Sequence, residues 1–500
     1  MKEIKIPECV TSIGGAAFRD CESLESFNIP SGVTSIEYST FSDCKALKEV
    51  KIPDGVTSIG ESAFSDCESL ESVNIPSEIT SIEYRTFEGC KSLKEIKIPD
   101  SVVSIGTLAF YECESITNFD ISQFVTAIHG SAFGYCRALE KITVDEANDN
   151  YCSDNGVLYD KNKTALLQYP LAKNEDSFTI PESVNTVYPN AFAAAKNLKS
   201  VFVGSGVADI EYNVFADCDM LTNIAVDANN SEYCSDNGVL FDKNKSVIHA
   251  YPAGKEDMSY SVPDSVCTIS EDAFCGNKYI ETLNVPEKTD YIEAYTFANC
   301  INLKKINVAE NNPYLCSENG IVFNKEKTCL YIYPAGRTES SYVVSAGVDS
   351  VGWNVFDYAP ALKHVYFMNR TCWPGIANKN ITIHGFAGSS AEIFAKEYGF
   401  VFEEIKCDHS STVTVPAVPA TCIETGLTEG IKCAACGLVL KEQTETPLVA
   451  HRWDNGVVTV QPAIGVKGNM LYTCTVCHMT VNEDIPALSP QDITVTANDT

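Results

Sequence analysis

The sequence predicts an α/β, β-rich fold: a solenoid of short repeats with a parallel sheet on one face and short helical turns on the other. Hairpin inserts and a small Cys-rich C-terminal module are expected to complete it. Two observations predict this fold. Phenylalanine and cysteine recur every 23 residues in the first part of the chain, and a longer motif then returns every 82 residues. Fixed periods of this length are typical of arrays whose units bury their apolar sides only against their neighbours.

A single repeat unit shows how each element arises. The unit from Leu47 to Cys67 is LKEVKIPDGVTSIGESAFSDC. Its start alternates apolar and polar residues, which suits a strand with one buried face, and Pro53 ends that strand because proline donates no ladder hydrogen bond. Residues 56–59 form a second extended piece, and residues 61–67 are expected to form about one turn of helix. The phenylalanines in register are Phe18, Phe41, Phe64, Phe87, Phe110 and Phe133, followed later by Phe192, Phe215, Phe274, Phe297 and Phe356.

Longer inserts interrupt the array after residue 144. The segment YCSDNGVLYDKNKT begins at Tyr151, and related segments begin at Tyr233 and Leu315, which leaves a 36-residue insert in each copy. Within the insert, VLYD and ALLQYP flank a polar turn at residues 161–163, so a β-hairpin is expected. We therefore assign residues 1–144 to plain repeats and residues 145–365 to repeats with hairpin inserts.

The two ends of the array differ. Residues 366–406 are expected to form a C-terminal cap in which ITIHGF is a strand, AEIFAKEY is a helix and FVFEEI is a closing strand. Ser389 or Ser390 is the expected N-cap of the helix, and Gly399 is its expected end. At the other end, Met1 stands in the leucine position of a repeat already in progress, which predicts that the chain is truncated at its N-terminus.

The ladder cysteines are expected to be free. They follow the phenylalanine in each matching repeat, and stacked strands place equivalent Cβ atoms about 4.8 Å apart, beyond the usual disulfide range of about 3.5 to 4.5 Å. Buried thiols that act as small apolar side chains are therefore predicted. These residues are Cys21, Cys44, Cys67, Cys90, Cys113, Cys136, Cys218 and Cys300.

The repeats resemble the BspA-like leucine-rich repeat family of microbial surface proteins. The segments I-P, V-T-S-I, A-F and C-x-S-L, together with D-N-G-V-L-Y-D-K-N-K-T in the inserts, carry the resemblance over roughly residues 1–405. It implies a non-enzymatic, secreted or cell-surface protein that binds or adheres to a host or matrix protein. The alternative is a glycan-binding accessory module of a surface enzyme system, and a third reading is an enzyme that uses a metal in the tail.

Charge, hydropathy and the absence of known motifs argue against several other functions. The chain has 67 acidic and 36 basic residues and a formal charge of -31, so it would repel nucleic acid and anionic lipid. No apolar run is long enough to insert into a membrane, and no signal peptide or anchor is visible, so an extracellular location follows from the resemblance alone. Phosphate-binding loops, H-E-x-x-H and nucleophile-elbow motifs are absent, which argues against an enzyme.

The exposed positions of the strand at the start of each repeat are the candidate binding residues. Reading down the array, this column is mixed in charge early and more aromatic late. Aromatic side chains are frequent binding anchors, although they are equally expected to pack on an insert or on the cap. The candidates are Lys51, Asn74, Lys97, Phe202, His364 and Tyr366.

The composition changes abruptly at Cys407. Residues 407–451 are expected to form a Cys-rich module, residues 452–488 a second, degenerate copy, and residues 489–500 a tail. The module resembles small Cys-rich repeats at the ends of bacterial surface proteins, with P-A-x-x-A-T-C, G-L-T-E-G and C-x-x-C-G.

Metal binding is the predicted role of the tail cysteines. Two thiolates separated by two residues fit one tetrahedral ion, and a closed set of thiolate and imidazole ligands selects structural zinc. Disulfides are the alternative in an oxidising compartment. The predicted ligands are Cys422, Cys433, Cys436 and His451, with Cys407 and His409 as alternatives.

Overall fold

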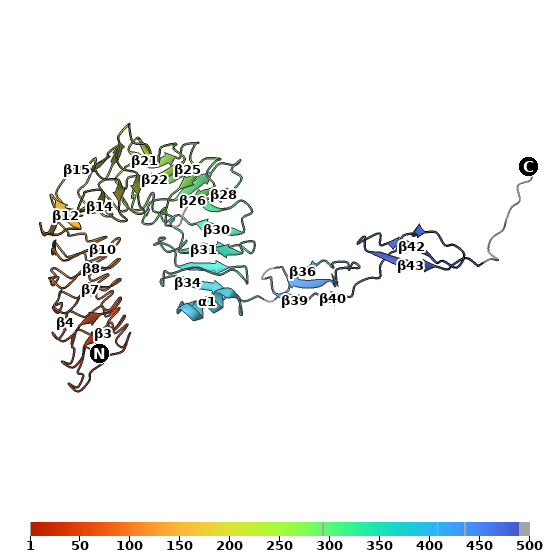
Figure 1. Cartoon of the computed structure of the whole chain (residues 1–500), viewed down its shortest axis with the longest axis horizontal. Helices are drawn as coiled ribbons and strands as arrows, with labels where there is room; N and C mark the ends of the chain where they lie inside the picture. The colour runs from red at the N-terminus through yellow and green to blue at the C-terminus, as the bar shows by residue number, and fades with distance from the viewer. Residues whose placement is uncertain (1, 293–294, 408, 435–436, 490–500) are drawn as a thin grey trace, which may run out of the picture. The chain divides into compact units, whose positions relative to one another are not determined.

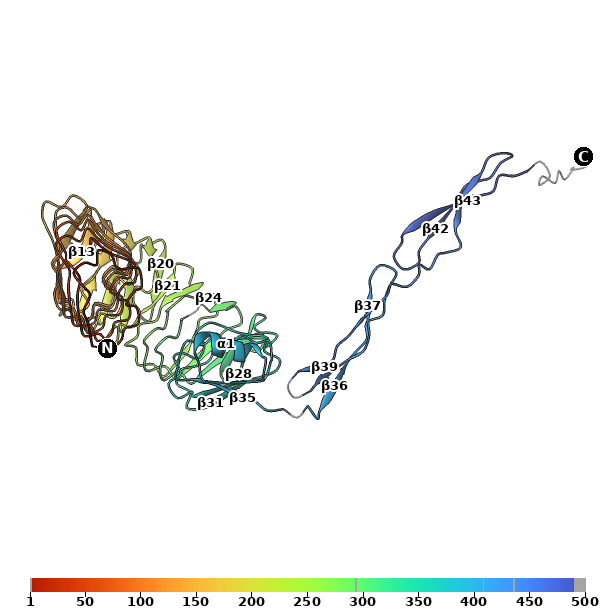
Figure 2. The same ribbon diagram turned by 90° about the horizontal axis from the view of Figure 1, so that it is seen from below.

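The computed structural model describes residues 2–292, 295–407, 409–434 and 437–489. The chain forms two compact units. The first comprises residues 1–342, 347–365 and 373–382, and it contains the repeats. The second comprises residues 343–346, 366–372 and 383–500, and it contains the cap helix and the Cys-rich tail. Figure 1 shows the repeats of the first unit as successive rungs, and Figure 2 views the early rungs almost end on.

Parallel strands line the first face of the solenoid, one in each repeat except the repeat around Lys97. Their register is that of the 23-residue period, for example Phe27 opposite Val50. The expected single sheet is divided: β1, β2, β4 and β6 form one sheet, the strands after them form groups of two or three, and β31 and β33 belong to a four-stranded sheet with two strands of the cap. The strands are β1 (Glu3–Ile4), β2 (Ser26–Asn28), β4 (Glu49–Lys51), β6 (Ser72–Val73), β9 (Asn118–Ile121), β11 (Lys141–Val144), β15 (Ser177–Thr179), β17 (Ser200–Val203), β19 (Asn223–Val226), β23 (Ser259–Ser261), β25 (Thr282–Val285), β27 (Lys305–Val308), β31 (Ser341–Val344) and β33 (His364–Phe367).

A second set of very short strands lies on the other face. These strands arise from the V-T-S-I segments, and most bury their second residue, as Ile59 does, whereas Ile210 and Ile292 are half-buried. They are β3 (Ser35–Ile36), β5 (Ser58–Ile59), β7 (Ser81–Ile82), β8 (Ser104–Ile105), β10 (Ala127–Ile128), β16 (Thr186–Val187), β18 (Asp209–Ile210), β24 (Thr268–Ile269), β26 (Tyr291–Ile292) and β32 (Ser350–Val351).

The segments expected as helical turns are non-helical turns. Ser39 and Asp43 adopt the left-handed backbone conformation, with φ of 50° and 60°. The backbone N–H groups of Ser39, Phe41 and Asp43 donate to carbonyl oxygens of the next rung at 2.8 to 2.9 Å. A helical turn would direct these groups within its own rung, so the turn gains inter-rung hydrogen bonds that a helix would lose.

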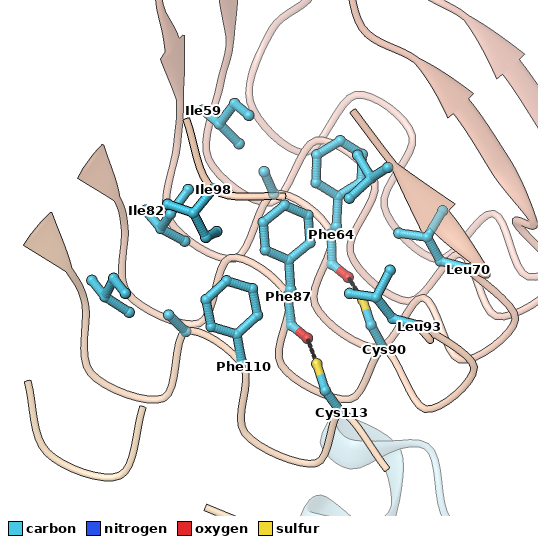
Figure 3. Close-up of a cluster of buried hydrophobic side chains, with 14 of the residues drawn as sticks. Ile59, Phe64, Leu70, Ile82, Phe87, Cys90, Leu93, Ile98, Phe110 and Cys113 are labelled. Atoms are coloured by element: carbon cyan, nitrogen blue, oxygen red, sulfur yellow. Dashed lines mark hydrogen bonds between the residues drawn. The ribbon is translucent and has the colours of Figure 1, made fainter. Parts of the chain in front are cut away.

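The core between the two faces is a column of phenylalanine rings. Phe41, Phe64, Phe87 and Phe110 are fully buried, and successive ring centroids lie 5.4 to 5.6 Å apart with nearly parallel planes. Figure 3 shows three of these rings with the neighbouring cysteines. The ladder cysteines are free thiols. Each buried thiol has a role: that of Cys90, for example, donates to the carbonyl oxygen of Phe64 at 3.2 Å.

Each insert forms three strands, one more than the hairpin that the sequence predicts. In the first insert, β12 (Tyr151–Asp154), β13 (Val157–Asp160) and β14 (Ala165–Gln168) are antiparallel. β14 then pairs in parallel with β16, so the insert extends the second face. The later copies are β20 (Tyr233–Asp236), β21 (Val239–Asp242), β22 (Val247–Ala250), β28 (Leu315–Glu318), β29 (Ile321–Asn324) and β30 (Cys329–Ile332).

A buried asparagine anchors each insert. In the second copy, the Nδ2 of Asn230 donates to the carbonyl oxygens of Gly204 and Val207, both at 2.8 Å. Its Oδ1 accepts from the N–H groups of Glu232 and Tyr233 at 2.9 and 2.7 Å. Asn148 and Asn312 are equally buried in the other copies. One side chain thereby satisfies four backbone groups where the chain leaves the repeat.

The cap has the elements that the sequence predicts. β34 (Thr382–Gly385) pairs in parallel with β35 (Phe402–Glu404), and α1 (Ser390–Tyr398) connects them. Ser389 is the N-cap, and Gly399 ends the helix with a φ of 70°. No helix in the described ranges has the length and apolar character needed to cross a membrane.

The tail consists of two antiparallel modules. In the first, β36 (Thr412–Val415), β38 (Gly430–Cys433) and β39 (Val439–Lys441) form one sheet, and β37 (Gly426–Leu427) pairs with β40 (Glu445–Thr446). In the second, β42 (Gly468–Thr473) lies between β41 (Val457–Val460) and β43 (Thr480–Ile485).

Candidate functional site

A groove of about 1270 Å³ opens on the first face of the early repeats, and Lys51, Asn74 and Lys97 line it. It lies where the hydrogen bonds between neighbouring first-face segments become longer. The residues around Lys97 form no strand, and the N–H of Lys94 is 3.4 Å from the carbonyl oxygen of Glu71, whereas the equivalent bond from Lys48 measures 2.9 Å. The structure therefore brings three of the predicted binding residues together.

The groove presents charges of both signs. Lys51 and Lys97 are exposed and alternate along the array with Asn74 and Asp120. Asn74 also has a structural role, because its side chain donates to the carbonyl oxygen of Ile52 at 3.0 Å and accepts from the Ile52 N–H at 3.4 Å. Among the described residues, the side chains of Lys51 and Lys97 make no such hydrogen bond to the backbone, so they are the better candidates for contact with a partner. A complementary surface would need both acidic and basic side chains.

The aromatic candidates lie elsewhere. Phe202 and His364 are half-buried, and neither lines the groove. Tyr366 stacks on the buried ring of His384 from β34, with centroids 4.0 Å apart. The ring expected as an exposed anchor is therefore partly covered by a residue of the cap.

Two clusters of potential metal ligands occupy the tail. Cys407, His409 and Cys433 form one, and their ligand atoms lie within 4.8 Å of one another. Cys422, His451, Cys474 and Cys477 form the other. The predicted set of Cys422, Cys433 and His451 is thus divided between two clusters, and its fourth member, Cys436, lies outside the described residues.

The register of the first module explains this division. Thr412 pairs with Cys433, and Val418 bridges to Leu427, so Cys422 lies in the turn of a hairpin whose base carries Cys433. The two sulfurs are at opposite ends of that hairpin. Sequence spacing alone does not show which loops meet in space, although the C-x-x-C of the second module was a signal for a second site.

The spacing of ligand atoms suits a tetrahedral ion. The Sγ atoms of Cys422 and Cys474 are 3.8 Å apart, and the Sγ of Cys477 is 3.4 Å from the Nδ1 of His451. Tetrahedral zinc with bonds of about 2.3 Å to sulfur places two sulfurs about 3.8 Å apart. The Sγ atoms of Cys407 and Cys433 are 3.7 Å apart. Both clusters therefore have dimensions that could hold zinc.

Local backbone geometry supports the same chemistry. The N–H of Cys474 donates to the carbonyl oxygen of Met479 at 2.8 Å, and His478 donates back to the Cys474 carbonyl at 3.0 Å. Cys433 and Gly437 make the equivalent bonds in the first module. Hydrogen bonds from the backbone N–H groups of Cys477 and Val476 lower the pKa of the Cys474 thiol to about 5. Burial raises the pKa of the Cys422 thiol to about 11.

Comparison with known protein families decides the identity of the repeats. The model of the BspA type leucine rich repeat region matches six copies, within residues 1–84, 63–155, 172–246 and 256–326. The chain belongs to this family. The BspA-type match ends before the cap and the Cys-rich tail.

Two solved structures are similar to this chain. A leucine rich cell surface protein from Faecalibacterium prausnitzii A2-165 is 30% identical over 62% of this BspA-type chain and 79% of its own, with a TM-score of 0.50. A leucine-rich repeat protein from Eubacterium ventriosum ATCC 27560 is 23% identical over 74% of this chain and 84% of its own, with a TM-score of 0.41. A comparison with curated proteins finds no match.

Proposed function

We propose that this BspA-type protein is a non-enzymatic, extracellular or cell-surface protein that binds a host or matrix protein through the groove around Lys51 and Lys97. The groove carries the proposal, because it combines a large opening with exposed charges of both signs. Charges in this arrangement steer and orient a protein partner. The description of the Faecalibacterium relative as a cell surface protein supports the location.

Charge reversal in the groove tests the proposal. The double variant Lys51→Glu, Lys97→Glu should weaken binding to immobilised matrix proteins by at least tenfold, whereas Lys288→Glu, an exposed lysine outside the groove, should not. Surface plasmon resonance with a panel of purified matrix proteins measures the effect. The proposal fails if no matrix protein binds, or if the double variant binds as tightly as the unmodified chain.

We also propose that both tail clusters hold structural zinc. Their ligand types and spacings carry this proposal, and a tetrahedral ion would provide the stability that such small modules cannot obtain from an apolar core. Elemental analysis of the full chain should find close to two equivalents of zinc. Less than a tenth of an equivalent, with oxidised tail cysteines, would instead establish the disulfide alternative.

A further inference from the structure

The third insert carries a pocket whose lining residues differ from those at the equivalent positions of the first two inserts. The pocket has a volume of about 590 Å³, within the range of small-ligand sites, and its floor includes the apolar side chains of Ile292, Leu315 and Val322. Large aromatic rings surround it. They are Tyr291, Tyr314, Tyr331 and Trp353, with 58%, 54%, 45% and 68% of their surfaces exposed.

The 82-residue period supplies an internal comparison for these rings. The equivalent residues of the preceding copy are Asp209, Glu232, His249 and Glu271. Three acidic side chains and a histidine therefore become four exposed aromatic rings on the same framework. Exposed aromatic side chains are costly in solution, and their concentration at one place is typical of a binding surface.

One substitution enlarges the pocket, because the second copy has a smaller pocket of about 220 Å³ at the corresponding place, lined by Ile210 and Leu240 among others. In the first two copies a tyrosine occupies part of the space: the Tyr151 hydroxyl accepts a hydrogen bond from the Ile128 N–H at 2.8 Å, and that of Tyr233 accepts from Ile210 at 2.9 Å. The third copy has Leu315 at this position. Leucine is shorter and offers no hydroxyl, so the substitution leaves both a space and a missing acceptor.

The corresponding backbone donor in the third copy belongs to Ile292. The N–H of Tyr291 donates to the carbonyl oxygen of Cys267, the residue before β24, at 3.4 Å. Ile292 is the counterpart of Ile210, whose N–H donates to the Tyr233 hydroxyl, so the Ile292 N–H is directed to the same side of its own strand. It faces the side on which Leu315 has replaced the tyrosine. A ligand hydroxyl in the pocket would accept the hydrogen bond that the tyrosine hydroxyl accepts in the sister copies.

We propose that this pocket binds a neutral oligosaccharide. Sugar rings have flat C–H faces that pack on aromatic rings, and hydroxyls that pair with backbone N–H groups, phenols and carboxylates. The pocket supplies each of these groups, because Asp290 and Glu326 stand beside the four rings. The lining also includes Lys325, whose ammonium group donates to the carbonyl oxygens of Glu310 and Asn312. The two carboxylates outnumber this one cation and would repel sulfated or sialylated sugars.

The placement of the rings argues against a small cation as the ligand. An aromatic cage for an ammonium group closes its rings around one point. Within the described ranges, no two of the rings Tyr291, Tyr314, Tyr331 and Trp353 contact each other, although Tyr333 nearby packs edge-on against Tyr342. Rings that are spread around a pocket suit a ligand of several linked units. This site is distinct from the groove, and the sugar proposal does not depend on the protein-binding proposal.

Filling the pocket is the sharpest test. Leu315→Tyr introduces the residue of both sister copies, so the fold already accommodates it, and its hydroxyl would accept from Ile292. The full chain is titrated by calorimetry with cello-, malto-, xylo-, manno- and chito-oligosaccharides of three to five units. At least one should bind, and Leu315→Tyr should weaken that binding at least tenfold while the melting temperature stays the same or rises.

Two further variants separate the rings from the cavity. Trp353→Glu installs the residue of the second copy and should also weaken sugar binding at least tenfold. Tyr233→Leu opens the equivalent space in a copy that lacks the rings, and it should create no second sugar site. A sulfated oligosaccharide and a proline-rich peptide serve as competing probes.

The possible results are clear-cut. The proposal is overturned if no neutral oligosaccharide binds, if Leu315→Tyr and Trp353→Glu bind sugar as the unmodified chain does, or if only the sulfated sugar or the peptide binds. Sugar binding that survives Lys51→Glu, Lys97→Glu but not Leu315→Tyr would support it and assign the pocket separately from the groove.

Discussion

Replacing Phe64 by alanine should destabilise the early repeats by about 4 kcal/mol. Its ring is fully buried and stacks between Phe41 and Phe87, with centroid distances of 5.4 and 5.6 Å. Truncating a buried phenylalanine to alanine costs about 3 to 5 kcal/mol, because apolar burial is lost and a cavity remains. The flanking rings belong to rungs fixed by inter-rung hydrogen bonds, so they cannot move in to close that cavity.

Hydrogen exchange measured by mass spectrometry, combined with urea unfolding, would detect the effect. In a solenoid each repeat contacts only its neighbours, so faster exchange should be confined to the early repeats and should spare the inserts after residue 151. Phe124→Ala removes a phenylalanine that is 45% exposed and should cost about 1 kcal/mol or less. If Phe64→Ala lowers the free energy of unfolding by less than about 0.5 kcal/mol, the assignment of this ring to the core is wrong.

Three further predictions follow from buried polar groups and from the tail. Asn230→Ala should lower the free energy of unfolding by about 3 kcal/mol in urea titrations, because four backbone groups lose their partner; an unchanged midpoint would contradict this. Burial raises the pKa of the carboxyl groups of Asp66, Glu88 and Glu112, so the folded chain binds their protons more readily than the unfolded chain. The melting temperature should therefore rise as the pH falls from 7 towards about 4.5, and Glu88→Gln should reduce that rise; a melting temperature that falls over this range would exclude the effect. Cys474→Ser should remove one of the two expected zinc equivalents in elemental analysis, and retention of both would exclude the second site.

The periodic part of the fold could be predicted because its signal repeats. Each rung places an apolar residue at the same position, so Phe64 and its counterparts identify the core, and Ser389 and Gly399 identify the ends of the cap helix. The turns at Ser39 and Asp43 were mispredicted as helical because their left-handed residues are ordinary polar side chains. Only the inter-rung hydrogen bonds favour that conformation.

The sites were less predictable because they depend on which segments meet. The C-x-x-C pairs indicated metal binding, but the neighbours of Cys422 follow from a hairpin register that no local motif encodes. The covering of Tyr366 by His384 requires a contact between strands that are separate in sequence. The pocket at Leu315 becomes visible only when the third copy is compared with the first two in three dimensions.

The thiol ladder has a consequence for how the chain tolerates its surroundings. Burial raises the pKa of Cys67, Cys90 and Cys113 well above the ordinary value, and each thiol proton is already held by a phenylalanine carbonyl oxygen. Thiol–disulfide exchange proceeds through the thiolate, so these sulfurs are poor nucleophiles even when oxidants surround the folded chain. The rungs that carry these three thiols can therefore keep one covalent structure in both reducing and oxidising compartments.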